Sequence, residues 1–514
     1  MLIKLVSLPL LGIFINNFII PLFFNEKNKN KFIGVSSMII TILVLYISLY
    51  IYLTMNNNSN EFQYREIIDL YYIRMSLGLD GVGLSVILII TLIFPILILL
   101  SKNESNIKEG YDLNSIKNYK NLVNILLIME TILILIFISL DILLFFIMFE
   151  FILIPMFLII GKFGSRVNKI EAAYRFLIYT MIGSLVMLIS IILLYLKFGT
   201  TNLEILNIKI LELYDSNQFL LLKILWIFIF FSFMIKIPMF PFHTWLPEAH
   251  TEAPTIGSII LAAILLKLGT FGIYRFSIYL FNTPSYLFFF NNRKFEYIYN
   301  YFLPFIFILS LLSIFYCSFI AIQSTDLKKI IAYSSIVHMN FSIFGFFSGD
   351  ILGFTGSTFL MFSHAFVSGA LFLLIGILYK RYHTRILFYF KGLVFTMPLF
   401  SSFFLFFSLA NISLPFTSSF IAEIFIIIST FKINLFLTLI LTFSLIFSSC
   451  YVMFLANRIL FSSLTSSIYI PFFLDLSFNE FISLFPMFFF TIFFGIYPKP
   501  LLGLFSLNLI NVLF

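Results

Sequence analysis

The sequence predicts an all-α polytopic membrane protein, and three observations carry that prediction. Of its 514 residues, 61% are hydrophobic and only 11% are charged, whereas soluble domains are roughly 45–50% apolar and about 25% charged. The apolar residues form continuous runs of about 20, the length that a helix needs to cross a bilayer. Because backbone in lipid must satisfy its own hydrogen bonds, and because these runs are too long for barrel strands, they are predicted to be helices.

The apolar runs number about fourteen by the length rule. Their approximate ranges are 5–24, 33–53, 82–100, 121–140, 142–161, 172–196, 219–250, 255–279, 302–323, 328–347, 353–379, 393–430, 433–460 and 481–497. The first run is longer than a signal-peptide core and lacks a convincing cleavage site, so we interpret it as a retained span.

Charge and cysteine content exclude several classes of protein. The net charge is +8, but no basic stripe with interleaved aromatics occurs, so no nucleic-acid partner is expected. In a membrane protein such an excess belongs to the cytoplasmic or matrix loops. Cys317 and Cys450 lie in apolar runs without a CxxC pattern, which predicts small buried side chains and no metal site.

Two apolar runs are too long for one ordinary helix, and both contain proline. Residues 219–250 are interrupted at Pro238 and Pro241, and residues 393–430 at Pro415. Proline breaks a helix, and irregular backbone at membrane depth survives only when it is buried in protein or lines a wet cavity. The two runs are spans 7 and 12 in the count. Equivalent breaks in two halves are typical of inverted-repeat transporters with the site at the break.

The repeat predicts four segments along the chain. Residues 1–120 hold spans 1–3, residues 121–279 a first five-helix repeat (spans 4–8), residues 302–460 a second, inverted repeat (spans 9–13), and residues 461–514 span 14 and a tail.

The charge of the connections supports the span count. Connections after odd-numbered spans are rich in basic residues, and connections after even-numbered spans are poorer. The positive-inside rule then places the odd connections on the cytoplasm-like side and both termini on the other. The odd connections carry Lys27, Lys29, Lys31, Lys102, Lys108, Lys117, Lys120, Lys162, Arg166, Lys169, Lys328, Lys329, Lys380, Arg381, Arg385, Lys391 and Arg458, and the even ones Arg65, Arg74, Lys197, Lys209, Arg293, Lys294 and Lys432.

Six ionisable side chains are predicted to lie inside the membrane on six different spans. Each costs about 2.5–3.5 kcal/mol or more at a helix centre and therefore requires a reason. Lys236 would instead be interfacial if its helix simply ended at Pro238, and a lone buried histidine is often only structural. Glu130 is a further intramembrane acid with no obvious partner, and its role stays open. The six are Glu150, Lys236, Lys267, His338, His364 and Glu423.

Acids, lysines and histidines in this arrangement are chemically a proton relay. Burial disfavours the charged form of each group and an opposite charge favours it, so a buried lysine can be poised between its two forms. Histidines titrate near neutrality and pass protons between distant groups. Moving a proton against 100 mV costs about 2.3 kcal/mol, so the chain needs an outside drive. The sequence shows no nucleotide-binding loop, haem site or flavin site that could supply one.

Several stretches resemble the antiporter-like membrane subunits of NADH–ubiquinone oxidoreductase, respiratory complex I, and among them the chain 4 family. The most specific is KIPMFPFHTWLPEAHTEAPTIGSIILAAILLKLGTFGIYR; FFIMFEFILIPMFLIIGKFG, STDLKKIIAYSSIVHMN and NISLPFTSSFIAE are similar as well. The likeness covers about residues 80–460. EAPTIGSIILAAILLK and the terminal glutamate favour chain 4 over the sister chains 2 and 5. Phe416 and Ala422 depart from the family pattern at the second break.

The resemblance implies a fold, an activity and a set of residue roles. It implies about fourteen helices with two inverted five-helix repeats, and proton translocation driven by quinone reduction elsewhere in the complex. Glu150 is expected to pair with Lys236. Lys267, His338 and His364 are expected to follow along the relay, and Glu423 is expected to serve as the exit-side acid. NADH, FMN, Fe–S clusters and ubiquinone are expected in other subunits, with no cofactor in this chain.

The same resemblance implies partners and a location. The partners are other complex I membrane subunits, especially the antiporter-like chains 2 and 5, together with lipids and protons. The mitochondrial inner membrane is favoured over a bacterial plasma membrane. Two alternatives stay open from the residues alone: a subunit of a multi-subunit cation/proton antiporter, and a structural subunit whose charges only hold helices together.

Overall fold

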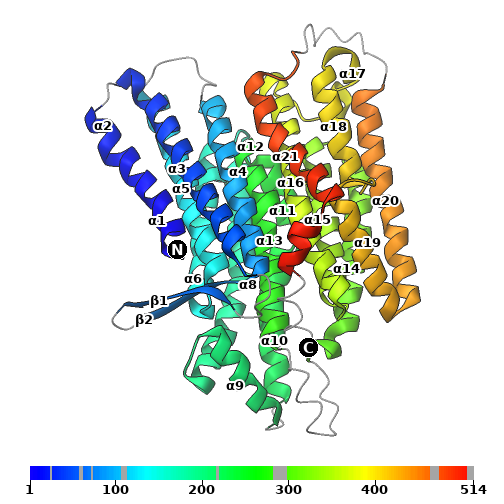
Figure 1. The fold of residues 1–514 in the computed structure, drawn as a ribbon. Coiled ribbons are helices and arrows are strands. Elements are labelled where there is room, and N and C mark those ends of the chain that lie inside the picture. Colours follow the sequence, from blue (N-terminus) through cyan, green and yellow to red (C-terminus); the bar gives the residue numbers. More distant parts are fainter. Residues whose placement is uncertain are drawn as a thin grey trace.

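The computed structural model describes residues 1–23, 26–56, 62–70, 73–105, 113–215, 219–281, 298–462 and 474–505. They form a bundle of long, roughly parallel helices (Figure 1). Within these residues, twelve helices are long and apolar enough to cross a membrane. Their bounds are Leu2–Phe23, Asn28–Thr54, Gly81–Lys102, Asn118–Ile138, Ile142–Phe163, Lys169–Phe198, Phe219–Lys236, Thr255–Tyr279, Asn300–Gln323, Ile351–Tyr382, Leu435–Leu460 and Phe478–Ile496.

The chain forms the following helices and strands, most of which are labelled in Figure 1. They are α1 (Leu2–Phe14), η1 (Ile15–Ile19), α2 (Ile20–Phe23), α3 (Glu26–Thr54), β1 (Gln63–Leu70), β2 (Ile73–Leu79), α4 (Gly81–Ser105), α5 (Leu113–Ile138), α6 (Ile142–Phe151), α7 (Leu153–Phe163), α8 (Lys169–Phe198), α9 (Leu203–Asp215), α10 (Phe219–Lys236), α11 (Trp245–Glu252), α12 (Thr255–Ile260), η2 (Leu261–Leu265), α13 (Leu266–Gly272), η3 (Ile273–Tyr279), α14 (Ile298–Gln323), α15 (Leu327–Phe346), α16 (Ile351–Tyr382), η5 (Leu387–Tyr389), α17 (Leu393–Thr396), α18 (Pro398–Asn411), α19 (Ser418–Ile433), α20 (Leu435–Leu460) and α21 (Phe478–Ile496).

Two further helical segments occupy the remaining predicted spans. Helix α15 stands where span 10 is expected, and the pair α18 and α19 stands at span 12. The all-helical membrane fold is therefore confirmed, whereas the count of fourteen and the inverted repeats stay predictions.

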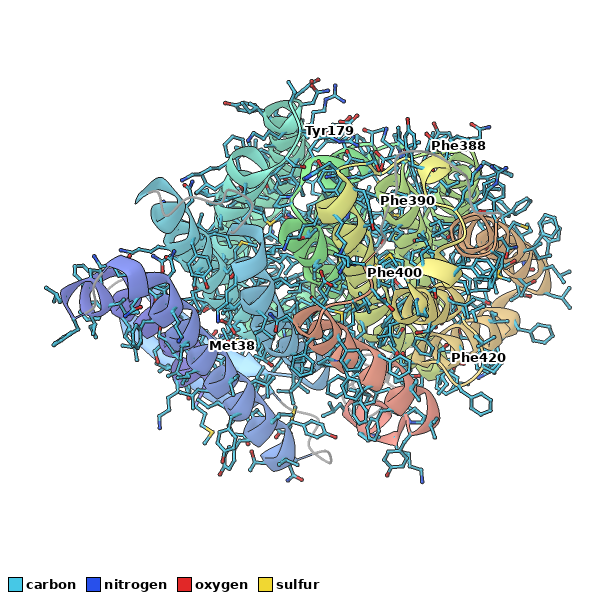
Figure 2. The ribbon with its side chains drawn as sticks, turned by 90° about the horizontal axis from the view of Figure 1, so that it is seen from above. Met38, Tyr179, Phe388, Phe390, Phe400 and Phe420 are labelled. Carbon is cyan, nitrogen blue, oxygen red and sulfur yellow. The ribbon has the colours of Figure 1, made fainter. Side chains whose placement is uncertain are left out.

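The core of the bundle lies around two helices that other helices cover on every side. In both the span Thr255–Tyr279 and helix α16, the most apolar stretch is buried throughout. Helix α16 packs against α12, η2, α15, α18, α19 and α21. An outer helix such as α8 buries only 39% of the equivalent stretch. Seen from above, side chains fill the space between helices and project outward around the rim (Figure 2).

The first proline-bearing run is broken in the structure. Helix α10 ends at Lys236, and the chain turns before the short helix α11 begins at Trp245. The break leaves backbone groups without helical partners, and such groups must find others. The Trp245 indole donates to the Ile235 carbonyl at 3.1 Å, and the Phe240 amide donates to the Ser313 hydroxyl at 2.9 Å.

The second run is broken in the same way between α18 and α19. Helix α18 ends at Asn411 and α19 begins at Ser418, so Pro415 lies in the interruption. The Ser419 hydroxyl donates to the Ala410 carbonyl at 2.6 Å and spans the gap. Helix α21 crosses the interruption at Gly495, where a Cβ would overlap the Phe416 carbonyl.

The connections gather at two opposite ends of the bundle. At the lower end in Figure 1 lie α9 and a hairpin of antiparallel strands β1 and β2. The hairpin meets the α5–α6 connection through a Leu77–Ser139 bridge, and Asp141 of that connection meets Asn202. At the upper end, Asp326 bridges to Ile386, which joins the α14–α15 and α16–α17 connections. We call this upper end, with Arg166, Asp326 and Arg385, the basic face.

The hairpin is a feature that the all-helical prediction missed. Its second strand, IRMSLGL, alternates apolar and polar residues but is too short for a membrane span, and a period of two favours a strand. Of the basic residues assigned to connections, Lys108, Arg293 and Lys294 lie outside the described residues.

Candidate functional site

Lys267 lies in the middle of the bundle and contacts a histidine. It stands on α13, directly after the π-helical segment η2, a backbone form that often marks functional sites. Its side chain is 0% exposed. The ammonium donates to the Ala262 carbonyl at 2.6 Å and lies 2.9 Å from Nδ1 of His364 on α16.

The chain of polar contacts continues from His364 to an acid. The rings of His364 and His338, on the adjacent helix α15, have centroids 5.7 Å apart. Nδ1 of His338 lies 3.4 Å from a carboxylate oxygen of Glu423 on α19, and both side chains are about 5–6% exposed. The structure thus brings four of the six predicted residues into one buried row that runs across α13, α16, α15 and α19.

Lys236 is the last residue of α10, at the edge of the first break, and its ammonium is buried without a hydrogen-bond partner among the residues that the structure describes. It lies 4.6 Å from the ring centre of Phe149 and 5.7 Å from that of Phe176, distances typical of cation–π contacts. Glu150, which follows Phe149 on α6, acts on Lys236 electrostatically. The expected pair is therefore placed in one neighbourhood, but aromatic rings rather than a salt bridge surround the ammonium.

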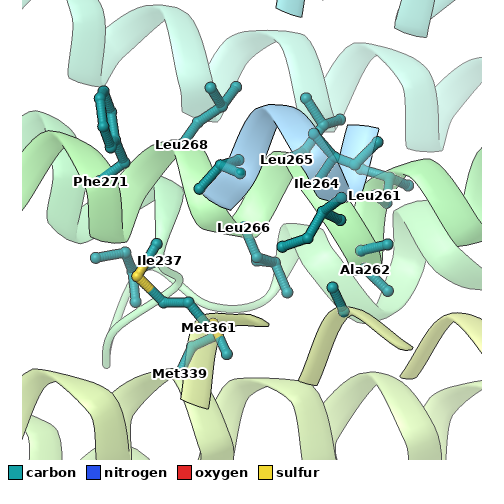
Figure 3. Close-up of a cluster of buried hydrophobic side chains, with 14 of the residues drawn as sticks. Ile237, Leu261, Ala262, Ile264, Leu265, Leu266, Leu268, Phe271, Met339 and Met361 are labelled. Atoms are coloured by element: carbon teal, nitrogen blue, oxygen red, sulfur yellow. The ribbon is translucent and has the colours of Figure 1, made fainter. Parts of the chain in front are cut away.

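The first break and Lys267 lie side by side. A Cβ added to Gly269, two residues after Lys267, would lie 3.3 Å from Lys236 Cβ and 2.5 Å from Cγ1 of Ile237. Figure 3 shows Ile237, Met361 and Met339 gathering near Leu266. These apolar side chains are all buried, so the lysines lie among apolar groups in the protein interior, where electrostatic interactions are stronger than in water.

Glu130 is completely buried on α5, and neither carboxylate oxygen has a hydrogen-bond partner among the described residues. Buried polar atoms normally have a partner, from protein or ordered water. No contact in the described chain links Glu130 to the row, so its participation stays a prediction.

The structure also contains buried charges that sequence reasoning missed. Arg275 and Asp80 form an ion pair at 2.5 Å with side chains 1% and 7% exposed, and Arg275 also donates to the Ser139 carbonyl at 2.9 Å. Lys328 and Arg385, which were assigned to solvated connections, are 0% and 1% exposed. Their only sequence signal is that each stands close to a helix terminus, where neighbouring segments can cover it.

Cysteine placement agrees only in part with expectation. Cys317 is buried, but Cys450 is exposed on the outer surface of α20, because that helix buries only one face. Among the described residues, no group of three or more histidine, cysteine, aspartate or glutamate side chains is arranged to hold a metal ion.

Fold and site together define a class of protein: a polytopic helical membrane protein with broken helices and a buried row of acid, histidine and lysine side chains. The transmembrane family described as NADH:quinone oxidoreductase/Mrp antiporter matches residues 139–449. The chain therefore belongs to this family, and within it to the group of NADH-ubiquinone oxidoreductase chain 4 proteins, as its curated relatives indicate.

Among those relatives, the Chondrus crispus chain 4 is 46% identical over 88% of this chain and 85% of its own length. The Marchantia polymorpha chain 4 is 45% identical over 84% of this chain and 81% of its own length. A chain of respiratory complex I from Thermus thermophilus has a similar fold, with a TM-score of 0.80, 24% identity and coverage of 99% of this chain and 100% of that one. A chain of the archaeal membrane-bound sulfane sulfur reductase has a similar fold, with a TM-score of 0.83 and 19% identity. The match covers 100% of this chain and 98% of that one.

Proposed function

We propose that the buried row from Lys267 to Glu423 conducts protons for respiratory complex I. The chain is an antiporter-like core subunit of the membrane arm of this complex, NADH:ubiquinone oxidoreductase, in the mitochondrial inner membrane. It translocates protons as part of a redox-driven enzyme and binds other subunits of the complex. The antiporter-like chains 2 and 5 are its proposed neighbours, and the proposed location of NADH, FMN, Fe–S clusters and ubiquinone is in other subunits.

The observation that carries the relay is the continuity of the row. Lys267 and His364 are in hydrogen-bond contact at 2.9 Å, and His338 reaches Glu423 at 3.4 Å. An imidazole can accept a proton on one nitrogen and donate from the other, so two histidines between a lysine and a carboxylate can pass a proton in steps. A group of charges that served only to join helices would not need two titratable rings in series.

Lys236 is proposed as the element that couples the first break to this row. Its ammonium has no hydrogen-bond partner in the described chain, so its charge depends strongly on Glu150 and on the aromatic rings around it. A change in the charge or position of Glu150 would change the proton affinity of Lys236. Because Lys236 lies against the helix that carries Lys267, that change would act on the row electrostatically.

The test replaces a lysine by methionine, which removes the ammonium and keeps a side chain of similar volume. In the assembled complex, reconstituted in vesicles, Lys267→Met should lower the number of protons moved per NADH oxidised. The matched control is Lys223→Met, since Lys223 lies on α10 with its ammonium 3.6 Å from the Tyr301 ring centre, away from the row. If Lys267→Met transports as many protons per NADH as Lys223→Met, the relay is wrong and the charges are structural.

A further inference from the structure

The buried ion pair of Arg275 and Asp80 lies on the side of Lys267 that faces away from the basic face. Arg275 stands on η3 and follows Lys267 by eight residues of one continuous span, or about 12 Å of helix. Its guanidinium pairs with the Asp80 carboxylate at 2.5 Å and donates to the Phe137 and Ser139 carbonyls at 3.2 and 2.9 Å. The proposed relay uses neither member of the pair.

Segments from the lower end of the bundle converge on Arg275. Asp80 is the single residue between β2 and α4, and Ser139 directly follows α5. Phe62 directly precedes β1, and its ring centre lies 5.7 Å from the guanidinium carbon. The hairpin that contributes Asp80 and Phe62 lies at the end opposite the basic face (Figure 1). Arg275 therefore stands where the packed interior meets the connections of the lower end.

Aromatic rings fill the interior between this ion pair and the two lysines. Phe271 lies between Lys267 and Arg275 along the helix, and its ring centre is 4.3 Å from the guanidinium carbon. An added Cβ on Gly272 would lie 2.1 Å from the Phe233 ring, so that ring packs directly on the helix backbone. We call six rings, none more than 1% exposed, the aromatic layer: Phe137, Phe145, Phe149, Phe233, Phe271 and Phe276.

The aromatic layer is continuous enough to exclude water. The Phe137 and Phe271 rings meet edge to face at 4.8 Å, and the neighbouring centroids of the other four rings are 4.5 to 6.2 Å apart. Phe149 of this layer is also the ring that contacts the Lys236 ammonium. A buried water needs two to four polar partners, and phenylalanine rings supply none. The layer thus separates both lysines from the lower end by apolar contacts.

The ion pair closes the one polar position below this layer. A group that passes protons must both accept and donate them, whereas a guanidinium has five donors, no acceptor and a permanent charge. The Asp80 oxygen that accepts from Arg275 also accepts from the Gly83 amide at 3.0 Å, so its acceptor capacity is already in use. A fixed positive charge in a channel-like position is a barrier to protons and other cations.

We propose that the aromatic layer and the Arg275–Asp80 pair form a barrier that prevents protons on Lys236 and Lys267 from leaking to the lower end. With that direction closed, the hydrogen-bond contact of Lys267 with His364 at 2.9 Å is its route for losing a proton. Transfer therefore runs sideways along the row. This inference rests on the proposed function and adds to it the residues that prevent a short circuit of the gradient.

The experiment measures passive proton permeability of the assembled complex in vesicles, without NADH. A pH gradient is imposed, and its decay is followed with an entrapped pH indicator. Arg275→Gln with Asp80→Asn removes both charges but leaves amides that donate and accept hydrogen bonds. The matched control is Lys432→Gln with Asp350→Asn, which removes a 2.6 Å ion pair whose side chains are 55% and 27% exposed. Asp350 directly precedes α16, at the end of that helix away from the basic face.

We expect the gradient to decay about 10-fold faster with the Arg275 and Asp80 changes, which corresponds to about 1.4 kcal/mol of barrier, and at the unchanged rate with the control. Equal decay in the two would overturn the barrier and leave the ion pair a structural contact. Lys267→Met during NADH oxidation tests the relay separately, since normal pumping by it would overturn the relay whatever the passive decay. If the double variant does not assemble, Phe271→Tyr replaces it, because it keeps the ring and adds a hydroxyl to the aromatic layer, and the same comparison with the control decides.

Discussion

Gly269 determines how closely the first break can approach α13, and Gly269→Ala tests whether that approach matters. The added Cβ would lie 2.5 Å from Ile237 Cγ1 and 3.2 Å from the Ile237 backbone nitrogen, whereas ordinary contacts begin near 3.4 Å. Ile237 is 0% exposed, so it has little room to withdraw. Overpacking of this kind costs about 1–3 kcal/mol.

That cost corresponds to a shift of about 5-fold to 150-fold toward arrangements in which the break has moved away. Lys236 is the neighbour of Ile237, so its ammonium moves with it. Displacements of about 1 Å at a reacting group can lower rates about 100-fold. We therefore expect Gly269→Ala to assemble but to move at least about 5-fold fewer protons per NADH oxidised.

The assay is vesicle acidification per NADH oxidised, with Gly369→Ala as the matched control. Gly369 is also a buried helical glycine, but its added Cβ would meet nothing closer than Met487 Cε at 3.5 Å. A Gly→Ala change that fits its helix is neutral or slightly stabilising. Equal transport by the two variants would refute the argument that close packing at the break positions Lys236.

Three further outcomes follow from the buried contacts. Asp80→Leu leaves the Arg275 guanidinium buried without its carboxylate and should destabilise the chain by about 3–5 kcal/mol; Arg275→Met in the same chain should recover most of this, as a double-mutant cycle of thermal unfolding would show. Gly495→Ala should displace the second break, because its added Cβ would meet the backbone carbonyl of Phe416, which cannot rotate away. The expected result is a smaller amount of assembled complex than with the unchanged chain. Glu423→Gln keeps the shape of the side chain but removes the charge beside His338, so proton transport should fall while NADH oxidation by other subunits can still be measured, and unchanged transport would contradict the exit role.

Several features of the site could be predicted from residue order alone. Lys267, His338, His364 and Glu423 each interrupt an apolar run, and a charge in such a run is costly unless it faces protein. The two proline-bearing runs were also too long for single helices. Both observations depend on properties that a sequence carries locally: hydrophobicity, length and helix breaking. The structure places all four of these side chains in the interior, as that reasoning requires.

Other features depend on contacts between distant segments. Lys236 faces Phe149 rather than forming a salt bridge with Glu150, because rotamer choice follows from packing around the break. Lys328 belongs to a connection by its position in the chain, yet α11 and α12 cover it completely. The β-hairpin also escaped prediction, because its first strand shows no clear alternation and its pairing partner is a separate stretch of the chain.

The amino-acid order by itself determined that this is a helical membrane protein, where two of its helices break, and that six ionisable side chains lie within apolar runs. Those properties follow from transfer energies and backbone chemistry, which act residue by residue. Only the tertiary structure decided that Lys267, His364, His338 and Glu423 form one row and that distant segments of the chain bury Lys328. Distances between side chains on different helices are set by how the helices pack, and no local pattern encodes them.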